Sequence, residues 1–283
     1  MSIQSPSIVS GMVWCEVGRD AVWVAGADAE AYLQGQCSAD VAALGGGESA
    51  WTFLLQPSGK VDVLARVTRR PDGFVVDTDG GFGAVLVERL RRFLLRTKAT
   101  VEPLAWRGLS VRRPGPRLVT MGAELIVRAD WHGQPGFDIL GSTVEPPLGA
   151  TRIERPAYER LRVEAGWPAM GTELTPDTIP AESGVVLEAA SFTKGCYTGQ
   201  ELVARIDSRG GHVPHLLRHV RLSRPATPGD PLHFDGKEVG RLTSVAGDLA
   251  LAYVARAVEP PASADLGTVE AIPGARFVSS STI

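Results

Sequence analysis

The stretch with the clearest chemical potential is KGCYTGQE, residues 194–201. It places Cys196 close ahead of an expected helix, for which Thr198 and Glu201 have the spacing of a capping box. The amides and dipole of a helix N-terminus stabilise a thiolate, and Lys194 adds a nearby cation. The residues therefore predict a reactive thiol or an anion-binding turn. A small buried cysteine in a turn explains the same pattern equally well.

Three histidines, His212, His215 and His219, follow this motif. Histidines bind zinc, but no neighbouring cysteine or carboxylate completes a site, and Pro214 interrupts any helix. If residues 215–222 form a strand, His215 and His219 share one face. We therefore expect no metal site. The three cysteines are also too scattered for a permanent iron–sulfur cluster, which needs about four thiolates.

The composition is that of an ordinary globular protein, with 44% hydrophobic and 22% charged residues among 283. The formal net charge of −3 gives no general attraction to nucleic acid or anionic lipid. The first residues do not resemble a secretory signal, and no window reaches the roughly 20 apolar residues of a membrane span. Cys15, Cys37 and Cys196 form no CxxC pair, so we expect a reducing cytoplasm.

Strands and short helices are expected through the first hundred residues. Residues 21–24 read as a strand, and Asp28 can N-cap a helix that ends at Gly35. Residues 49–79 read as three strands separated by turns. A helix is expected over residues 85–98, with one apolar stripe and a cluster of basic side chains. We interpret that cluster as a solvated face rather than an anion site.

The second half of the chain is expected to begin with short strands over residues 101–148. A compact helix over residues 155–166 and a long irregular loop over 167–184 follow, and loops of that length are usually functional. After residue 210 the sequence pattern changes to alternating strands and turns. We therefore divide the chain into an α+β region, residues 1–210, and a small β domain, residues 211–283.

The octapeptide KGCYTGQE resembles the signature of the YgfZ family of folate-binding proteins, whose relatives include mitochondrial iron–sulfur assembly factors. The resemblance extends over most of the chain. GADAEAYLQGQCSADV is similar to the family's N-terminal segment, and LRVEAGWPAMGTEL to its central helix and loop. HFDGKEVGRLTSVAGDLALAYV is similar to the C-terminal barrel that the family shares with the T-protein of the glycine cleavage system.

This resemblance implies an α+β fold of three lobes arranged as a ring, with a C-terminal β-barrel and tetrahydrofolate bound near the central opening. It also implies a cytoplasmic accessory role in the assembly or repair of iron–sulfur cluster proteins. The partners would be iron–sulfur client proteins or the assembly machinery, with neither nucleic acid nor membrane. Whether the protein is formally an enzyme stays open.

The resemblance also implies residues for the folate site. Glu164, in LRVEAG, matches a folate-binding glutamate of the T-protein, and a carboxylate can accept two N–H bonds from a pterin edge. Tyr158 matches an aromatic position and could stack on a folate ring. Arg19 stands where a bacterial relative has tryptophan, and it could stack on folate or bind its glutamate tail.

The residues with implied chemistry are Asp62, Lys194 and Cys196. The T-protein carries two adjacent aspartates where this chain has Asp62 followed by Val63, and one of the two takes part in its proton transfer. The T-protein also lacks the cysteine of the KGCYTGQE motif. Both differences favour the folate-binding accessory role over the alternative, a folate-dependent aminomethyltransferase of T-protein type. A third interpretation is an interaction module that has lost folate.

Overall fold

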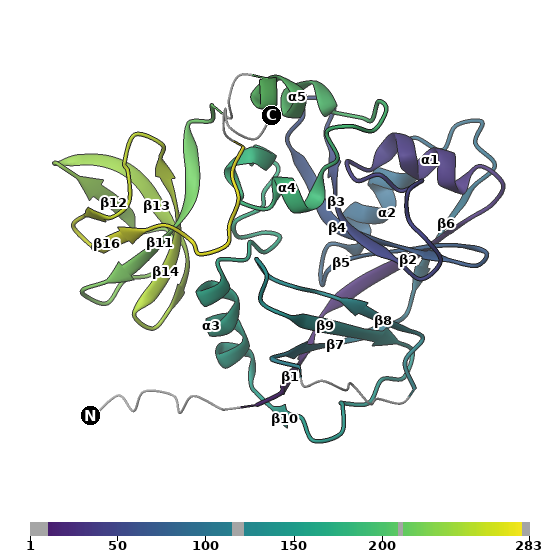
Figure 1. The fold of residues 1–283 in the computed structure, drawn as a ribbon, viewed down its shortest axis with the longest axis horizontal. Coiled ribbons are helices and arrows are strands. Elements are labelled where there is room, and N and C mark those ends of the chain that lie inside the picture. Colours follow the sequence, from purple (N-terminus) through teal and green to yellow (C-terminus); the bar gives the residue numbers. More distant parts are fainter. Residues whose placement is uncertain (1–10, 115–121, 209–211, 279–283) are drawn as a thin grey trace.

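The computed structural model describes residues 11–114, 122–208 and 212–278, apart from the side chains of 205–208. Its strands form three sheets, and these sheets surround a central region of helices and loops (Figure 1). The predicted boundary between residues 210 and 211 lies outside the described part of the chain. No helix within the described ranges is long and apolar enough to cross a membrane.

The first sheet is antiparallel and has the strand order β3-β4-β5-β2-β6. Its strands are β2 (Arg19–Ala25), β3 (Ser49–Leu55), β4 (Val61–Arg70), β5 (Gly73–Asp79) and β6 (Thr100–Leu104). One face packs on α1 (Ala29–Gln36) and α2 (Gly83–Arg91), through a core that includes Val63 of β4 and Leu86 of α2. Side chains alternate along β4, so Leu64 and Arg66 lie on the opposite face of the sheet. This strand therefore contributes to the helix-covered core on one face and to the central region on the other.

The second sheet has the order β10-β1-β7-β9-β8. Its strands are β1 (Val13–Val17), β7 (Arg107–Arg112), β8 (Leu125–Arg128), β9 (Gly136–Gly141) and β10 (Thr151–Arg152). Only β1 and β10 run parallel. Because β1 precedes the entire first sheet in sequence and β7 follows it, the two sheets are interleaved along the chain. They pack through a small shared core that includes Ala21, Val75 and Leu140.

The third sheet is a curled half-barrel, which we call the barrel sheet, with the order β12-β13-β14-β11-β16-β15 (Figure 1). Its strands are β11 (His215–Leu222), β12 (Pro231–Phe234), β13 (Lys237–Ala246), β14 (Leu249–Ala255), β15 (Ala262–Ser263) and β16 (Gly267–Glu270). Every neighbouring pair is antiparallel. The fold is therefore the expected α+β class with a barrel-like C-terminal sheet.

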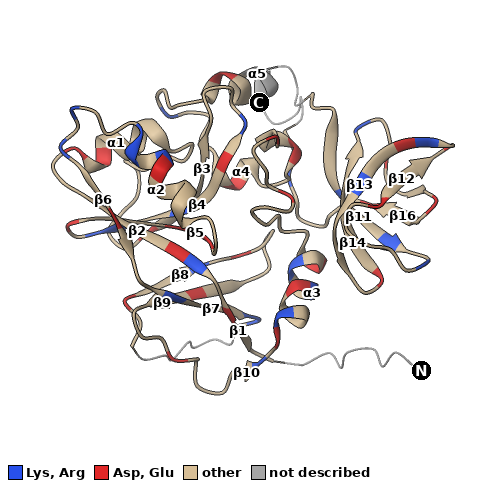
Figure 2. Cartoon of the chain, turned by 180° about the vertical axis from the view of Figure 1, so that it is seen from behind, with Lys and Arg blue, Asp and Glu red and all other residues tan. Residues whose placement is uncertain are grey.

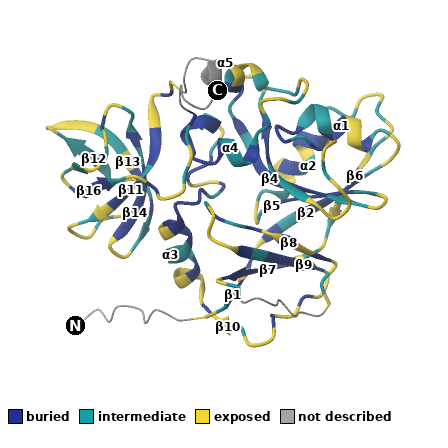
Figure 3. Ribbon diagram, in the orientation of Figure 1, coloured by how far each residue is buried: buried dark blue, intermediate teal, exposed yellow. Residues whose placement is uncertain are grey.

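The central region between the sheets holds α3 (Arg155–Ala165), the 3-10 helix η1 (Pro180–Glu182) and α4 (Val186–Ala189). Nearly all of the chain around η1 and α4 is buried (Figure 3). The helix α3 begins with Pro156 in its first turn and ends at Gly166 in the left-handed conformation, as predicted. Charges of both signs follow one another along α3 (Figure 2), which suits a helix with partners on several sides.

Two predicted helices differ from the structure. The helix expected over residues 85–98 ends at Arg91, because the chain must turn, with Arg96 at φ 62°, to reach β6 at Thr100. The prediction of a solvated basic face was wrong for Arg89, whose side chain is 2% exposed. Asp28 does precede α1, but its carboxylate accepts the Lys98 amide at 2.7 Å instead of capping the helix.

Candidate functional site

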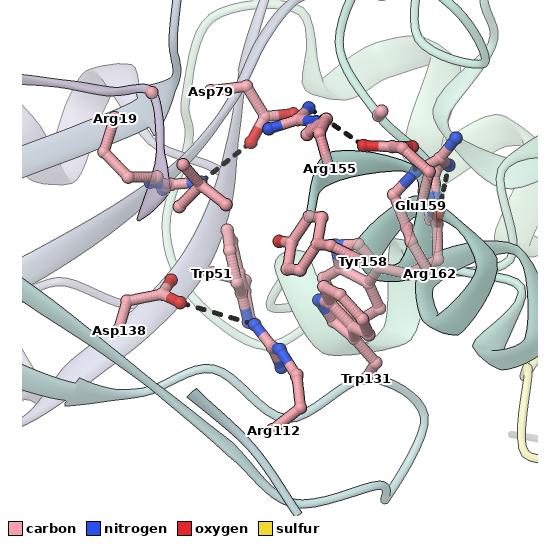
Figure 4. Close-up of a pocket in the computed structure, with 15 residues that line it drawn as sticks. Arg19, Trp51, Asp79, Arg112, Trp131, Asp138, Arg155, Tyr158, Glu159 and Arg162 are labelled. Atoms are coloured by element: carbon pink, nitrogen blue, oxygen red, sulfur yellow. Dashed lines mark hydrogen bonds and ion pairs between the residues drawn. The ribbon is translucent and has the colours of Figure 1, made fainter. Parts of the chain in front are cut away.

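A pocket opens where α3 faces the edges of the first and second sheets (Figure 4). Its walls are aromatic and come from four separate segments: Trp51, Trp131, Tyr158 and Trp167. The Trp51 and Trp167 ring centroids lie 5.2 Å apart, and Trp131 and Tyr158 meet edge to face at 5.5 Å. The hollow is narrow, with a cavity volume of about 50 Å³, and it opens to solvent at its mouth. We call it the aromatic pocket.

The floor of the aromatic pocket includes Arg19, Arg112 and Asp138, which belong to a network of buried arginine–aspartate pairs. Asp77 accepts hydrogen bonds from Arg19 and Arg66, and Asp138 accepts from Arg66 and Arg112. The Arg112 guanidinium lies 3.5 Å from the Trp131 ring centroid, so the network also supports one wall. Burial alone would lower the pKa of Arg19, but the neighbouring carboxylates outweigh it and raise that pKa. The floor therefore holds fixed charges of both signs.

Carboxylates also line the mouth of the pocket. Asp79 accepts from Arg19 at 2.8 Å and from the Met170 amide at 3.0 Å, and its side chain is 40% exposed. Glu159 accepts from Arg155 and Arg162 and is 30% exposed. Each carboxylate oxygen can accept two hydrogen bonds, so both groups keep capacity toward a bound molecule. The pocket thus combines flat apolar walls with acceptors at its edge.

The structure brings two of the three predicted folate residues to this pocket. Tyr158 and Arg19 both line it, and burial raises the pKa of the Tyr158 hydroxyl. Glu164 lies elsewhere, because helical spacing turns it to a different side of α3 from Tyr158. There its carboxylate pairs with Arg160, which also bonds Asp248 of the β13–β14 turn. Glu164 therefore faces the barrel sheet.

Asp62 lies on the far face of the first sheet, away from the aromatic pocket. The register of β3 and β4 shifts so that Leu54 pairs with Val63 and Leu55 with Val61, which leaves Asp62 as the additional residue of a bulge. The bulge turns its carboxylate to Arg89 of α2, 3.2 Å away. Burial raises the pKa of Asp62, although the Arg89 charge opposes that effect. Val63 is fully buried beside it and supplies no second carboxylate.

Lys194 caps the C-terminal end of α1. Its Nζ donates to the carbonyl oxygens of Gln34, Cys37 and Ala39, at 2.6, 2.7 and 2.8 Å. A lysine ammonium has three N–H donors, so all three are used on the backbone. Burial lowers the pKa of Lys194. The ammonium is therefore a fastening point for the motif segment, and the Cys196 thiol does not have it as a dedicated partner.

The rest of the KGCYTGQE segment packs on the turn after β3. Gly199 has φ 80°, and a Cβ there would lie 2.4 Å from the carbonyl oxygen of Gln56, so only glycine fits. Thr198 contacts Gln36 of α1 at 3.4 Å, and helix α5 (Gln200–Ser208) begins just after it. Cys196, by contrast, is exposed, whereas Cys15 and Cys37 are buried. The motif thus holds one thiol at the surface.

The histidines behave as single residues. His215 and His219 both lie on β11, as predicted, but His215 is exposed while His219 is buried and bonds the Val163 carbonyl oxygen at 2.7 Å. His212 is exposed. Across the described ranges, no group of three or more histidine, cysteine or acidic side chains is arranged to hold a metal ion.

Sequence reasoning missed most of the aromatic pocket. Trp51, Trp131 and Trp167 are far apart in the sequence, and so are Asp79 and Glu159. The one signal in the sequence was the residue type of the three tryptophans. Tryptophan is uncommon, and three of the six in this chain line this pocket. No spacing rule relates them, since each comes from a different element.

Comparisons with known proteins agree with this architecture. Residues 217–272 match the family model of the CAF17 C-terminal beta-barrel domain. The structure superposes on the crystal structure of the glycine cleavage system aminomethyltransferase T from Bartonella henselae with a TM-score of 0.76. The superposition covers 95% of this chain and 88% of that protein. At 19% identity this similarity shows the fold. The expected T-protein-like arrangement is confirmed.

The sequence relatives point to one family. The chain is 28% identical over 251 residues to the tRNA-modifying protein YgfZ of Cronobacter sakazakii, covering 78% of this chain and 74% of that protein. It is 29% identical over 213 residues to the YgfZ protein of Enterobacter sp., covering 67% and 65%. It is 39% identical over 99 residues to a candidate transferase of Arabidopsis thaliana chloroplasts, covering 35% and 22%.

The alignments with the Enterobacter and Arabidopsis proteins span less than two thirds of those proteins. Even so, relatives named YgfZ match most of this chain, the barrel sheet matches the CAF17 barrel, and the whole chain follows the T-protein fold. The resemblance carried by KGCYTGQE in the sequence is therefore confirmed: over most of its length the chain is similar to proteins of the YgfZ family.

Proposed function

We propose that this chain binds tetrahydrofolate in the aromatic pocket and serves as an accessory protein for the assembly or repair of iron–sulfur proteins. The observation that most strongly supports binding is the pairing of flat aromatic walls with carboxylates at the pocket mouth. A pterin ring can stack against Tyr158 or Trp131, and its N–H edge suits a carboxylate such as Glu159 or Asp79. Bound folate would supply one-carbon carrier chemistry.

The charges around the pocket support the same ligand. Arg155 lies at the mouth with its side chain 60% exposed, and its guanidinium is 5.3 Å from the Tyr158 ring centroid. An arginine there can attract the carboxylates of a folate glutamate tail. Arg19 lies deeper and already bonds Asp77 and Asp79, so we assign it to holding those carboxylates in place.

The binding test compares two glutamates on different sides of α3. Calorimetry with tetrahydrofolate should show that Glu159→Gln weakens binding at least about tenfold, or about 1.4 kcal/mol, whereas Glu164→Gln changes affinity less than about twofold. Thermal unfolding of both variants checks that each is folded. The reverse result would place folate on the barrel side of α3, where the resemblance alone would put it. Absence of binding by the wild type would remove folate from the proposal.

The accessory role is favoured over aminomethyl transfer because Asp62 stands alone. Val63, at the position of the second T-protein aspartate, is buried in the core of the first sheet, and Asp62 is engaged with Arg89. The protein should therefore fail to replace the T-protein in a reconstituted glycine cleavage assay. Turnover at rates comparable to those of the T-protein would favour the aminomethyltransferase instead.

The exposed thiol supports a role toward iron–sulfur proteins. A thiolate is a soft ligand and nucleophile, and Cys196 is presented by a segment that Lys194 and Gly199 fasten in place. In a deletion strain, Cys196→Ser should fail to restore the activity of iron–sulfur enzymes, although the protein folds and binds folate. Full restoration would assign the thiol a packing role only.

The relatives named tRNA-modifying proteins raise the question of direct RNA binding. With a formal net charge of −3, this chain has no general electrostatic attraction to phosphate backbones. We therefore propose that its partners are proteins, and that any effect on tRNA passes through a client enzyme. A filter-binding assay with bulk tRNA at moderate salt should show no saturable binding.

A further inference from the structure

One cluster of buried polar atoms lies outside the aromatic pocket. Among the described residues, four buried side-chain nitrogen or oxygen atoms have no hydrogen-bond partner: Nδ1 and Nε2 of His132, Oε2 of Glu188 and Nε of Arg69. Each such atom costs about 1–3 kcal/mol when left unpaired. Three of the four belong to His132 and Glu188, so the cost is concentrated at one place and requires a cause.

The two side chains come from different parts of the fold. His132 lies in the turn between β8 and β9, with φ 45° and its side chain fully buried. Glu188 lies on α4, with its side chain 19% exposed. The His132 Nδ1 atom is 3.8 Å from Glu188 Oε1, which is within ion-pair range but too long for a hydrogen bond. The pair thus bridges the second sheet and the central region.

The imidazole also supports the aromatic pocket. Its ring centroid lies 5.3 Å from that of Trp167, which forms one wall of the pocket. Trp167 in turn lies 5.2 Å from Trp51, another wall residue. A change in the position or charge of His132 therefore acts directly on a ring that lines the pocket.

Other charged groups close to the pair are Arg276 and His219. Arg276, in the C-terminal segment, places its Nε 3.4 Å from Glu188 Oε1. His219 of β11 is near enough to repel a charged His132. Arg276 leaves Glu188 Oε2 unpaired, so the carboxylate retains capacity for a second cation. Of the charged groups described around the imidazole, Glu188 is the one that attracts a proton to it.

We infer that His132 and Glu188 form a proton-dependent contact that positions Trp167. When His132 is protonated, Nδ1–H donates to Glu188 and the 3.8 Å separation closes into a hydrogen-bonded ion pair. The proton comes from solvent and no other bond changes. The contact ties the β8–β9 turn to α4 and fixes the Trp167 wall. When His132 is neutral, the contact opens and the wall loosens. His132 and Glu188 are positioning residues, and folate binding is not needed for the inference.

The test is a pH titration of the full chain by NMR, following the side chains of the five histidines and the indole N–H signals. Across the titrated pH range, the Trp167 indole signal should change in step with the His132 ring signals and with the same midpoint. In Glu188→Gln, the Trp167 signal should no longer follow His132, because the charged acceptor of the contact is gone.

Two further variants complete the design. His132→Gln keeps a neutral hydrogen-bonding side chain, so the Trp167 signal should become independent of pH over the same range. His233→Gln, on the barrel sheet beside Asp265, should leave the Trp167 titration unchanged. A Trp167 signal that does not follow His132 in the wild type, or one that still follows it in Glu188→Gln, would overturn the inference. The wild-type titration decides the question even if a variant fails to fold.

Discussion

Glu173 forms a buried ion pair with Arg162 of α3, with Oε2 3.0 Å from Nη1. Its other oxygen accepts the hydroxyl of Ser244 on β13 at 2.6 Å, and Ser244 in turn accepts from Arg162 at 2.7 Å. The three groups close a triangle between the long loop, α3 and the barrel sheet. The barrel is therefore attached to the rest of the molecule by a buried polar network as well as by apolar packing.

Removing the Glu173 carboxylate should loosen that attachment. Glu173→Leu leaves Arg162 buried with one carboxylate partner fewer, and breaking a buried pair in this way costs about 3–5 kcal/mol. Urea unfolding should show the loss. Adding Arg162→Met should recover part of it, because the double variant no longer buries an unpaired charge. A loss no greater than that of Asp177→Asn, at the exposed pair with Lys60, would contradict the network's role.

Lys194→Met should destabilise the KGCYTGQE segment. The methionine keeps much of the apolar stem but removes three donors, which leaves three carbonyl oxygens at the end of α1 without their cation. We expect a loss of about 2 kcal/mol or more in the free energy of unfolding. Hydrogen exchange should rise at the C-terminal end of α1. Lys60→Met, which removes a lysine with an exposed partner, is the control and should cost about 1 kcal/mol or less.

The cysteines should alkylate in the order Cys196, Cys15, Cys37. Burial raises the pKa of Cys15, and it raises the pKa of Cys37 to about 11 against the opposing charge of Lys194. At about pH 7.5 a thiol with that pKa is about three parts in ten thousand ionised, and the thiolate is the reacting form. Iodoacetamide labelling, measured peptide by peptide, should show the order in folded protein and lose it in denaturant. Equal rates for Cys37 and Cys196 in folded protein would contradict it.

Acidification should weaken the protein through His219. Burial lowers the pKa of His219 in the folded state, with its bond to the Val163 carbonyl opposing. The unfolded chain therefore takes up a proton first, and stability falls as the pH drops from about 6.5 toward the folded pKa. His219→Gln can still donate to Val163 and stays neutral, so its urea midpoint should fall less over that range.

The control for this prediction is His233→Gln, since His233 lies at the surface of the barrel sheet with its side chain 39% exposed. It should keep the acid sensitivity of the wild type. If His219→Gln and the wild type lose equal stability over that range of pH, the acid sensitivity originates at other groups.

Local patterns predicted the elements better than the site. The turn chemistry after Leu55 and Arg70 predicted the three strands of residues 49–79, and Pro156 with Gly166 predicted the bounds of α3. These signals act within a few residues. The end of α2 was not predictable from the apolar stripe, because the position of β6 determines where the chain must turn.

The site depends on which side chains face each other in the folded protein, and a pattern along the sequence does not contain that information. Tyr158 and Glu164 both lie on α3, and a motif alone does not show which side of that helix faces the aromatic pocket. Lys194 was expected to act on its neighbour Cys196, yet its ammonium bonds carbonyl oxygens at the end of α1, far away in the sequence. Sequence proximity therefore predicted the wrong partner, and the packing of the motif on α1 determined the right one.

The interleaving of the first two sheets has a consequence for the order in which the molecule can be built. β1 pairs with β7, and the whole first sheet lies between them in the chain. During synthesis β1 therefore emerges long before its partner, and it must wait unpaired while β2 to β6 are made and fold. The first sheet is contiguous and can close early, whereas the second sheet closes only when the chain returns through β7. A nascent chain interrupted before β7 would carry a folded first lobe and an unpaired apolar strand at its beginning, which is the kind of edge that chaperones bind.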